Sequence, residues 1–172
     1  ILPLVVEANL NILKDRKKLC KAIKVNNNQL KEEIAKKYFI DLSKIEEISI
    51  DTTLKRIVDI VPVSLVMAQA AVESGWGTSR FALEGNALFG QWTWDKSKGI
   101  EPQNASDTKA AVRKFETLND SIVAYMINLN THKAYSSMRS KRKRDCGQKK
   151  LISGYELANW MGNYAITREE YI

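Results

Sequence analysis

The sequence predicts a predominantly helical α+β fold, with a central buried helix and a small β lobe. Three observations indicate this. Apolar residues recur at helical spacing through most of the chain. Residues 62–74 are apolar on almost every face, which is typical of a helix at the centre of a domain. Residues 83–115 are rich in glycine, asparagine and tryptophan, and contain two short stretches of weak alternation.

The first part of the chain predicts amphipathic helices. Residues 4–23 and 26–39 both have helical spacing, and the asparagine run that opens the second can cap it. Residues 51–60 predict a third helix. No chemical motif occurs in the first two helices. We therefore interpret residues 1–51 as a helical arm or packing segment, and residues 52–172 as the main domain.

Proline and glycine mark the ends of the expected central helix. Pro62 suits a first helical turn, where no backbone N–H is needed. Gly75 and Gly77 follow Glu73 and end the helix. The remaining expected elements are strands at 91–94 and 110–115, turns at 95–99 and 102–107, a return helix at 118–135 capped by Asn119 or Asp120, and a last helix from 151 to about Met161.

The charge of the chain indicates an anionic partner. The formal net charge is +7, and much of it lies in a run that begins at Arg139 and ends at Lys150. Such a run is most simply a solvated loop, and its functional alternative is to hold an anionic wall polymer. No stretch has the roughly 18 uninterrupted apolar residues of a membrane span, so no transmembrane segment is expected.

Neither a metal nor a cofactor is expected. With one histidine, His132, and two distant cysteines, Cys20 and Cys146, the usual zinc ligand sets cannot be assembled. A Cys146–His132 nucleophile pair would lack an identifiable orienting group. Free thiols are the simplest expectation, although the two cysteines could pair in an exported protein.

Glu73 is the first candidate for chemistry. Burial and the negative end of a helix dipole both disfavour a charged carboxylate, so we expect the pKa of Glu73 to be raised. A carboxyl group that stays protonated near neutral pH is suited to protonate a poor leaving group such as a glycosidic oxygen. The alternative is a solvent-exposed glutamate at a helix end, and spacing alone does not decide between them.

The residues around Glu73 favour a sugar site. Tryptophans 76, 92 and 94 crowd around a glycine-rich bend with Phe89, and aromatic faces stack on the apolar faces of sugar rings. The side chains of Asn86 and Gln91 can hydrogen-bond hydroxyl and acetamido groups. Filling of the core is the alternative for the tryptophans. It does not explain their crowding beside glycine and asparagine in expected loops.

The same segment, MAQAAVESGWGTSRFALEGNALFGQW, resembles the active-site segment of bacterial peptidoglycan β-N-acetylglucosaminidases. The Bax-type proteins resemble it most, and the glucosaminidase domain of flagellar FlgJ proteins is more distant. Three more stretches agree in order: DIVPVSL, VRKFETLNDSIVAYMINLNTHKAY and NYAITREEYI. The resemblance covers about residues 52–172. Related chains usually continue into another helix, so the domain is expected to be truncated at its C-terminus.

The resemblance implies a lysozyme-like fold with a cleft between the helical body and the β lobe. It implies hydrolysis of the β-1,4 bond after N-acetylglucosamine in peptidoglycan. Glu73 matches the catalytic acid and Tyr164 the functional tyrosine. Glu101 is the preferred second carboxylate, in competition with Asp95, Asp107 and Glu116. The expected substrate-binding residues are Gln69, Ser74, Trp76, Asn86, Phe89, Gln91 and Trp92.

Two other functions remain open. A lytic transglycosylase would share the fold and the Glu-Ser pair, and would leave an anhydro-sugar end. A non-catalytic cell-wall or nucleic-acid binding domain would depend on the basic run at 139–150 instead of Glu73. We expect glycan strands of peptidoglycan as the partner, without nucleic acid, and a location in the cell envelope or periplasm, or secretion. Amidase activity is not expected.

Overall fold

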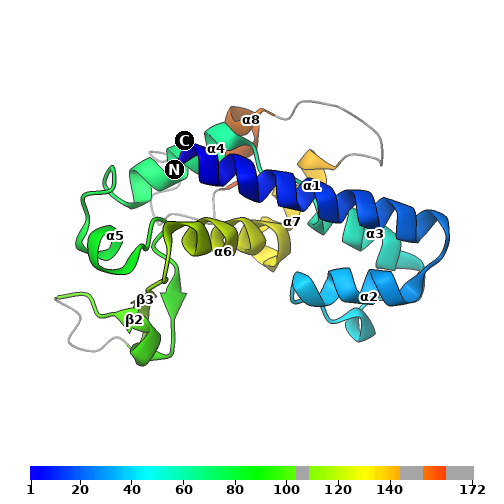
Figure 1. The fold of residues 1–172 in the computed structure, drawn as a ribbon, viewed down its shortest axis with the longest axis horizontal. Coiled ribbons are helices and arrows are strands. Elements are labelled where there is room, and N and C mark those ends of the chain that lie inside the picture. Colours follow the sequence, from blue (N-terminus) through cyan, green and yellow to red (C-terminus); the bar gives the residue numbers. More distant parts are fainter. Residues whose placement is uncertain (104–108, 144–152, 162–172) are drawn as a thin grey trace. The chain divides into compact units, whose positions relative to one another are not determined.

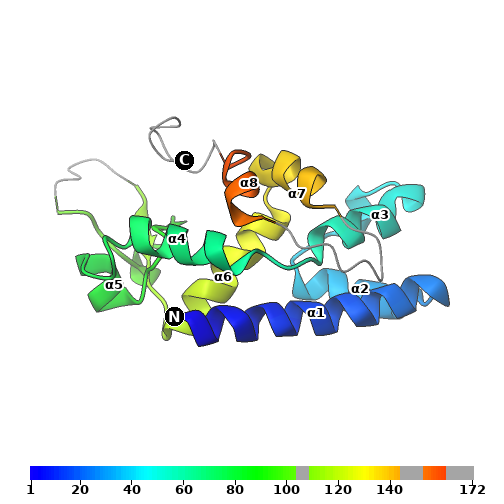
Figure 2. The same cartoon turned by 90° about the horizontal axis from the view of Figure 1, so that it is seen from above.

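The computed structural model describes residues 1–103, 109–143 and 153–161. It confirms a predominantly helical α+β fold (Figures 1 and 2). The helices are α1 Leu2–Lys24, α2 Asn28–Lys37, α3 Glu47–Ile57, α4 Val63–Glu73, α5 Arg80–Gly85, α6 Leu118–Thr131, α7 Ser136–Arg142 and α8 Gly154–Ala158. The strands are β1 Trp92–Thr93, β2 Gly99–Ile100 and β3 Ala111–Arg113, and the 3-10 turns are η1 Leu42–Lys44, η2 Lys96–Lys98 and η3 Lys133–Tyr135.

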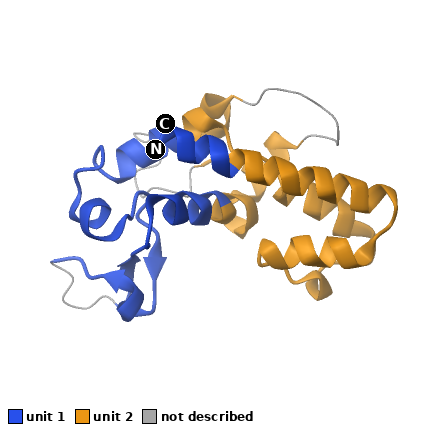
Figure 3. Cartoon of the chain, in the orientation of Figure 1, with its two compact units in different colours: residues 1–8, 66–126 blue, residues 9–65, 127–172 orange. Residues whose placement is uncertain are grey.

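The chain divides into two compact units, coloured separately in Figure 3. Unit 1 contains residues 1–8 and 66–126, and unit 2 contains residues 9–65 and 127–172. Three helices, α1, α4 and α6, have residues in both units. The boundary predicted between residues 51 and 52 falls inside α3 and stays a prediction.

The β lobe of unit 1 is a three-stranded antiparallel sheet in the order β1-β3-β2. Trp92 pairs with Val112, and Gly99 pairs with Arg113. Glycine is required at position 99 because a Cβ atom there would lie 2.5 Å from Cβ of Ala111 on β3. The sequence predicts β1 and β3. The stretch expected to be a turn, residues 95–99, contains η2 and the first residue of β2.

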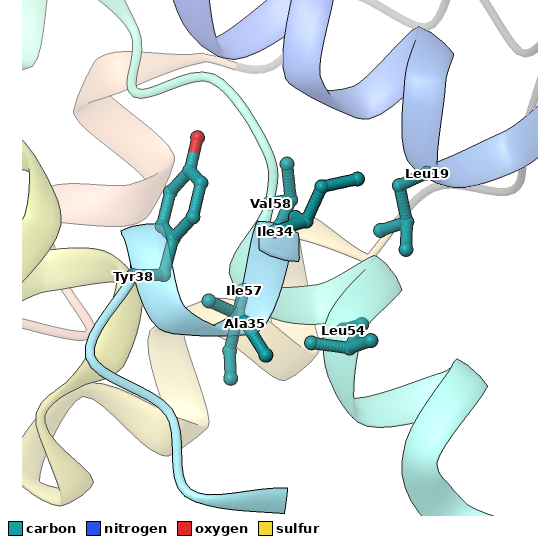
Figure 4. Close-up of a cluster of buried hydrophobic side chains, with 7 residues drawn as sticks. All are labelled: Leu19, Ile34, Ala35, Tyr38, Leu54, Ile57 and Val58. Atoms are coloured by element: carbon teal, nitrogen blue, oxygen red, sulfur yellow. The ribbon is translucent and has the colours of Figure 1, made fainter. Parts of the chain in front are cut away.

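The hydrophobic core of unit 2 joins the first three helices (Figure 4). The cluster consists of Leu19 from α1, Ile34 and Ala35 from α2 with Tyr38 at its C-cap, and Leu54 and Ile57 from α3 with Val58 at its C-cap. Asn27 caps α2 by accepting a hydrogen bond from the N–H of Leu30, as the asparagine run predicts. The amphipathic patterns of the first 60 residues therefore produce a helical packing unit.

Buried polar side chains of α1 hold the segment that leads into α4. The amide of Asn9 donates to the carbonyl of Val61 at 2.8 Å and accepts from its N–H at 3.0 Å. Arg16 donates to the carbonyl of Val58 at 2.8 Å and lies 3.6 Å from the Asp59 carboxylate. Because these groups are buried, their pairing fixes where α4 begins.

Two expectations about helices need correction. The prediction that α4 is buried on every face is wrong for one face. Ser64, Ala68 and Val72, which are spaced four residues apart, are exposed. The cap of α6 is Thr117, whose hydroxyl accepts from the N–H of Asp120 while the Asp120 carboxylate accepts from the N–H of Thr117. This reciprocal pair is a capping box, which places Asp120 inside the first turn.

Short helices account for the other differences. The sequence did not predict α5 or α7, and α8 ends at Ala158 instead of near Met161.

The expectation of free thiols is wrong for Cys20, which is disulfide-bonded. Cys146 lies outside the described residues.

Candidate functional site

The candidate site lies in unit 1, where α4 ends at Glu73. Immediately beyond it, Gly75, Trp76 and Gly77 have φ angles of 58°, 58° and 79°. Left-handed backbone is unfavourable for a tryptophan, and such strained residues concentrate at functional sites. The N–H of Trp76 donates to the carbonyl of Ala71 at 2.7 Å, which closes the end of the helix.

Ser74 braces this turn from inside. Its hydroxyl donates to the carbonyl of Ala70 at 2.5 Å and accepts from the N–H of Gly77 at 2.7 Å. Only 1% of Ser74 is exposed. The structure therefore gives Ser74 the role of shaping the turn, and does not support the predicted direct contact with substrate.

A second loop approaches the Glu73 carboxyl group. Gly90 has a φ of 57°, and a Cβ atom at this position would lie 3.7 Å from Oε2 of Glu73. The N–H of Leu88 donates to the hydroxyl of Ser121 on α6 at 3.2 Å. Glycine at position 90 thus meets the need for left-handed backbone, and its backbone lies beside the Glu73 carboxyl group.

Phe89, Tyr125 and Gln69 connect that loop to α4. The ring of Phe89 stacks on Tyr125 of α6 with a centroid distance of 3.9 Å and an interplanar angle of 7°. The Tyr125 hydroxyl donates to Oε1 of Gln69 on α4 at 3.1 Å. Phe89 and Gln69 are 2% and 4% exposed, so the structure places both beneath the surface instead of lining it as predicted. They position the loop against the helix that carries Glu73.

Three tryptophans of unit 1 are exposed. Trp76 is 84% exposed, Trp92 on β1 is 58% exposed and Trp94 is 80% exposed. The core-filling alternative is therefore wrong for all three. Exposed aromatic rings of this size are candidate surfaces for a ligand.

The two amides near this region differ in their availability. The Nδ2 group of Asn86 donates to the carbonyls of Phe115 and Glu116, both at 3.0 Å, and Asn86 ends α5 with a left-handed φ of 51°. Asn86 thereby holds the loop before β1 in place. Oε1 of Gln91 is buried and has no hydrogen-bond partner among the residues that the structure describes.

Three of the four competing second carboxylates, Glu101, Asp95 and Glu116, are described, and all three are exposed. Glu101 forms an ion pair with Lys96 at 3.0 Å, with 56% of its side chain exposed, and its carbonyl accepts from Arg80 at 2.5 Å. Asp95 caps η2, and its hydrogen bonds from Ser97 together with Lys98 hold its pKa below the usual range. Glu116 is exposed, and Asp107 lies outside the described residues.

The basic run at 139–150 is only partly a solvated surface. Arg139 is 8% exposed and donates to the carbonyls of Leu129 and His132 at 3.1 and 2.7 Å. Burial lowers the pKa of its guanidinium group, and the charge of Arg56 adds to the effect. Arg142 is 1% exposed and donates to the carbonyl of Arg56 at 3.0 Å. These two arginines hold unit 2 together and cannot face an anionic polymer.

Tyr164 lies outside the described residues, as do residues 144–150 of the basic run. Within the described ranges, no three of the His, Cys, Asp and Glu side chains gather as metal ligands would. In the same ranges, no helix is both long and apolar enough to cross a membrane.

The described part of the site combines a carboxyl group at the C-terminus of α4, the backbone of Gly90 beside it and exposed aromatic rings on the same unit, an arrangement suited to acid chemistry. Sequence motifs identified Glu73 and the tryptophans. They gave no signal for Tyr125 and Ser121, which stand in an ordinary helical pattern on α6.

Comparison with known proteins agrees with this chemistry. A family model described as Glucosaminidase, mannosyl-glycoprotein endo-beta-N-acetylglucosaminidase, matches residues 52–171. Protein Bax from Escherichia coli strain K12 is 42% identical over 112 residues, which cover 64% of this chain and 39% of that protein. The match thus spans about two fifths of the relative's length. No solved structure matches significantly.

Proposed function

Because the chain belongs to the glucosaminidase family, we propose that it hydrolyses the β-1,4 bond after N-acetylglucosamine in peptidoglycan, with Glu73 as the general acid. Membership of the family supports a glycosidase that acts on glycans. The observation that carries the finer assignment is the position of Glu73, which ends α4 with the backbone of Gly90 beside its carboxyl group.

In the proposed reaction, the Glu73 carboxyl group donates its proton to the glycosidic oxygen as the bond from that oxygen to C1 breaks. The negative end of the α4 dipole disfavours the carboxylate and so favours the protonated acid before the reaction. Water finally adds at C1, one of its protons restores the acid, and the product has a new reducing N-acetylglucosamine end. The exposed rings of Trp76 and Trp92 supply surfaces on which sugar rings stack.

Two groups can assist the attack at C1. Either Glu101 activates the attacking water, or the substrate's own acetamido carbonyl attacks C1 and water opens the resulting ring. Under the second alternative, Tyr164 would hydrogen-bond the acetamido group and hold it in place. The ion pair of Glu101 with Lys96, on an exposed part of the β lobe, favours the acetamido group.

We also propose that the protein acts outside the cytoplasm. The disulfide of Cys20 supports this location, because disulfides persist in oxidising compartments. Peptidoglycan lies in such a compartment. The exposed lysines of the run, Lys141 and Lys143, are the residues that would contact an anionic wall polymer.

Digestion of purified peptidoglycan tests the proposal. The expected products carry reducing N-acetylglucosamine ends, identified by mass spectrometry after borohydride reduction. Anhydro-sugar ends, which resist reduction and are lighter by one water, would identify a lytic transglycosylase instead. Binding to peptidoglycan without any new chain end would contradict catalysis and support a binding domain.

A further inference from the structure

The longest helix of the chain has an exposed face that the proposed function does not use. α1 has 23 residues and is about 35 Å long, at a rise of 1.5 Å per residue. Figure 2 shows it as one unbroken helix. Its buried side chains, among them Ile12, Leu19 and Ala22, point to the opposite side, where Leu19 joins the core of unit 2.

The first half of the exposed face is apolar. Leu2, Val6, Leu10 and Leu13 recur every three or four residues and are 51%, 41%, 52% and 40% exposed. Residues at this spacing lie in one row along a helix. An isolated exposed leucine is ordinary, whereas a row of four along one helix indicates a surface that is covered in use.

The second half of the same face is basic. Lys14, Lys17, Lys21 and Lys24 continue the row at spacings of three and four residues, and Lys18 lies at its edge. All five are exposed, and none forms an ion pair in the part of the chain that the structure describes. Of the two acidic residues of α1, Asp15 is buried and pairs with Lys37 at 2.6 Å, and Glu7 is exposed about two turns before Lys14, the first lysine of the row.

We propose that this face of α1 docks on an anionic lipid surface. Leucines that enter the boundary between headgroups and acyl chains, with lysines that contact lipid phosphates, are the two components of helices that lie in a membrane interface. The charge of the row argues for anionic lipid as the occupant. A second copy of the chain would either bring like-charged lysines together or, in an antiparallel pairing, set them against leucines without a counter-charge, and a purely apolar partner would also leave them unpaired.

Vesicle flotation at about physiological ionic strength tests the proposal. The full chain is mixed with vesicles of phosphatidylcholine alone, or of phosphatidylcholine with about 30% phosphatidylglycerol, which supplies the anionic surface that recruits basic segments. We expect binding only to the anionic vesicles, and weaker binding as the salt concentration rises. Equal binding to both kinds of vesicle, or to neither, would overturn the proposal.

Two variants test the two halves of the face. Replacing Lys14, Lys17, Lys21 and Lys24 with glutamine should weaken binding at least about a hundredfold, because each lysine near an anionic surface contributes roughly fivefold. Leu10→Gln with Leu13→Gln should weaken binding at least about tenfold, since buried apolar area is lost. If the leucine variant binds as the parent does, the lysines act by charge alone and the interfacial helix is wrong.

Matched controls remove equal charge or equal apolar surface elsewhere. Glutamine at Lys36, Lys109, Lys114 and Lys133, all exposed and outside α1, makes the same change in net charge. Ile48→Gln with Leu83→Gln removes two side chains that are 90% and 73% exposed. Both controls should bind vesicles as the parent does.

Sedimentation without lipid tests the other occupant. If the chain forms concentration-dependent dimers that the leucine variant abolishes, the face binds a second copy and the proposal is overturned.

Discussion

Apolar side chains are used in opposite ways in two regions of the molecule. In unit 2, the cluster around Leu19 and Leu54 is closed, and both residues are 0% exposed. In unit 1, the turn after Glu73 holds Trp76 in left-handed backbone with 84% of it exposed. The cluster in unit 2 stabilises the fold by burial, whereas the turn in unit 1 has an unfavourable backbone conformation and leaves an aromatic ring in water.

Charged side chains also differ between the two regions: two arginines are buried in unit 2, and two carboxylates are exposed in the β lobe of unit 1. In unit 2, the guanidinium groups of Arg139 and Arg142 are buried against backbone carbonyls. In the β lobe of unit 1, Asp95 and Glu101 lie on the surface beside lysines. Burial thus separates packing residues from candidate functional residues better than residue type does, and each prediction below tests one side of this comparison.

The largest expected effect is at Glu73. Glu73→Gln should reduce hydrolysis of peptidoglycan at least about a hundredfold, the usual scale of acid catalysis, because the amide cannot donate the required proton. Release of reducing ends measures the rate, and thermal unfolding should be unchanged. Glu84→Gln on α5 is a suitable control, since its side chain is 58% exposed in an i,i+4 pair with Arg80. A Glu73→Gln variant near the parental rate would remove Glu73 from the mechanism.

The next largest effect is on stability, in the basic run. Arg142→Ala should lower the free energy of unfolding by about 2–4 kcal/mol, because it opens a cavity and leaves the carbonyl of Arg56 without its donor. Lys143→Ala, one residue further and exposed, should change it by less than about 0.5 kcal/mol. Urea unfolding measures both. Equal, small effects would restore the interpretation of the run as a solvated loop.

The sequence predicted those features that repeat along the chain. Helical spacing identified α1, α2, α3, α4 and α6, and a strong motif marked Glu73. It did not predict α7, because seven residues rich in serine and arginine carry no apolar period. Only the packing of unit 2 shows that Arg139 and Arg142 are buried. Likewise, β2 is two residues long and forms only because β3 pairs with it.

Within the candidate site, the sequence predicted exposed residues better than buried ones. The aromatic crowding indicated Trp76 and Trp92, both of which are exposed. It did not separate them from Phe89, which stacks on Tyr125. That difference depends on a partner more than 30 positions away in the sequence, and no local pattern carries such information.

A smaller effect is expected where packing supports the site. Tyr125→Phe keeps the ring that stacks on Phe89 but removes the hydrogen bond to Gln69, so stability should fall by about 1 kcal/mol. If the Phe89 loop positions substrate beside Glu73, kcat should also fall several-fold with little change in the pH profile. A loss of stability with unchanged kcat would confine Tyr125 to packing.

The pH dependence of unit 2 provides a still smaller effect. Burial, and then the nearby Asp15 carboxylate and its hydrogen bond, raise the pKa of Tyr38 well above its usual value. A raised folded-state pKa means that the stabilising contribution is complete below the unfolded value of about 10 and is lost as the pH rises above it. The loss should be about 0.8 kcal/mol by pH 10.5. Urea unfolding of Tyr38→Phe should lack this component; identical pH profiles for the two proteins would contradict it.

The smallest effect is expected at Glu101, where the contrast between exposed carboxylates and the helix-end acid is sharpest. Glu101 is exposed and already paired with Lys96, so we expect Glu101→Gln to change the rate by less than about threefold, within the range of a surface ion pair. Lys96→Gln is the matched control, because it breaks the same pair and leaves the carboxylate intact. If Glu101→Gln lowered the rate as much as Glu73→Gln while Lys96→Gln did not, Glu101 would be the base that activates water. The reaction would then invert the anomeric centre, which proton NMR of the first-formed product detects directly. A small effect together with retained configuration would leave the substrate's acetamido group as the nucleophile.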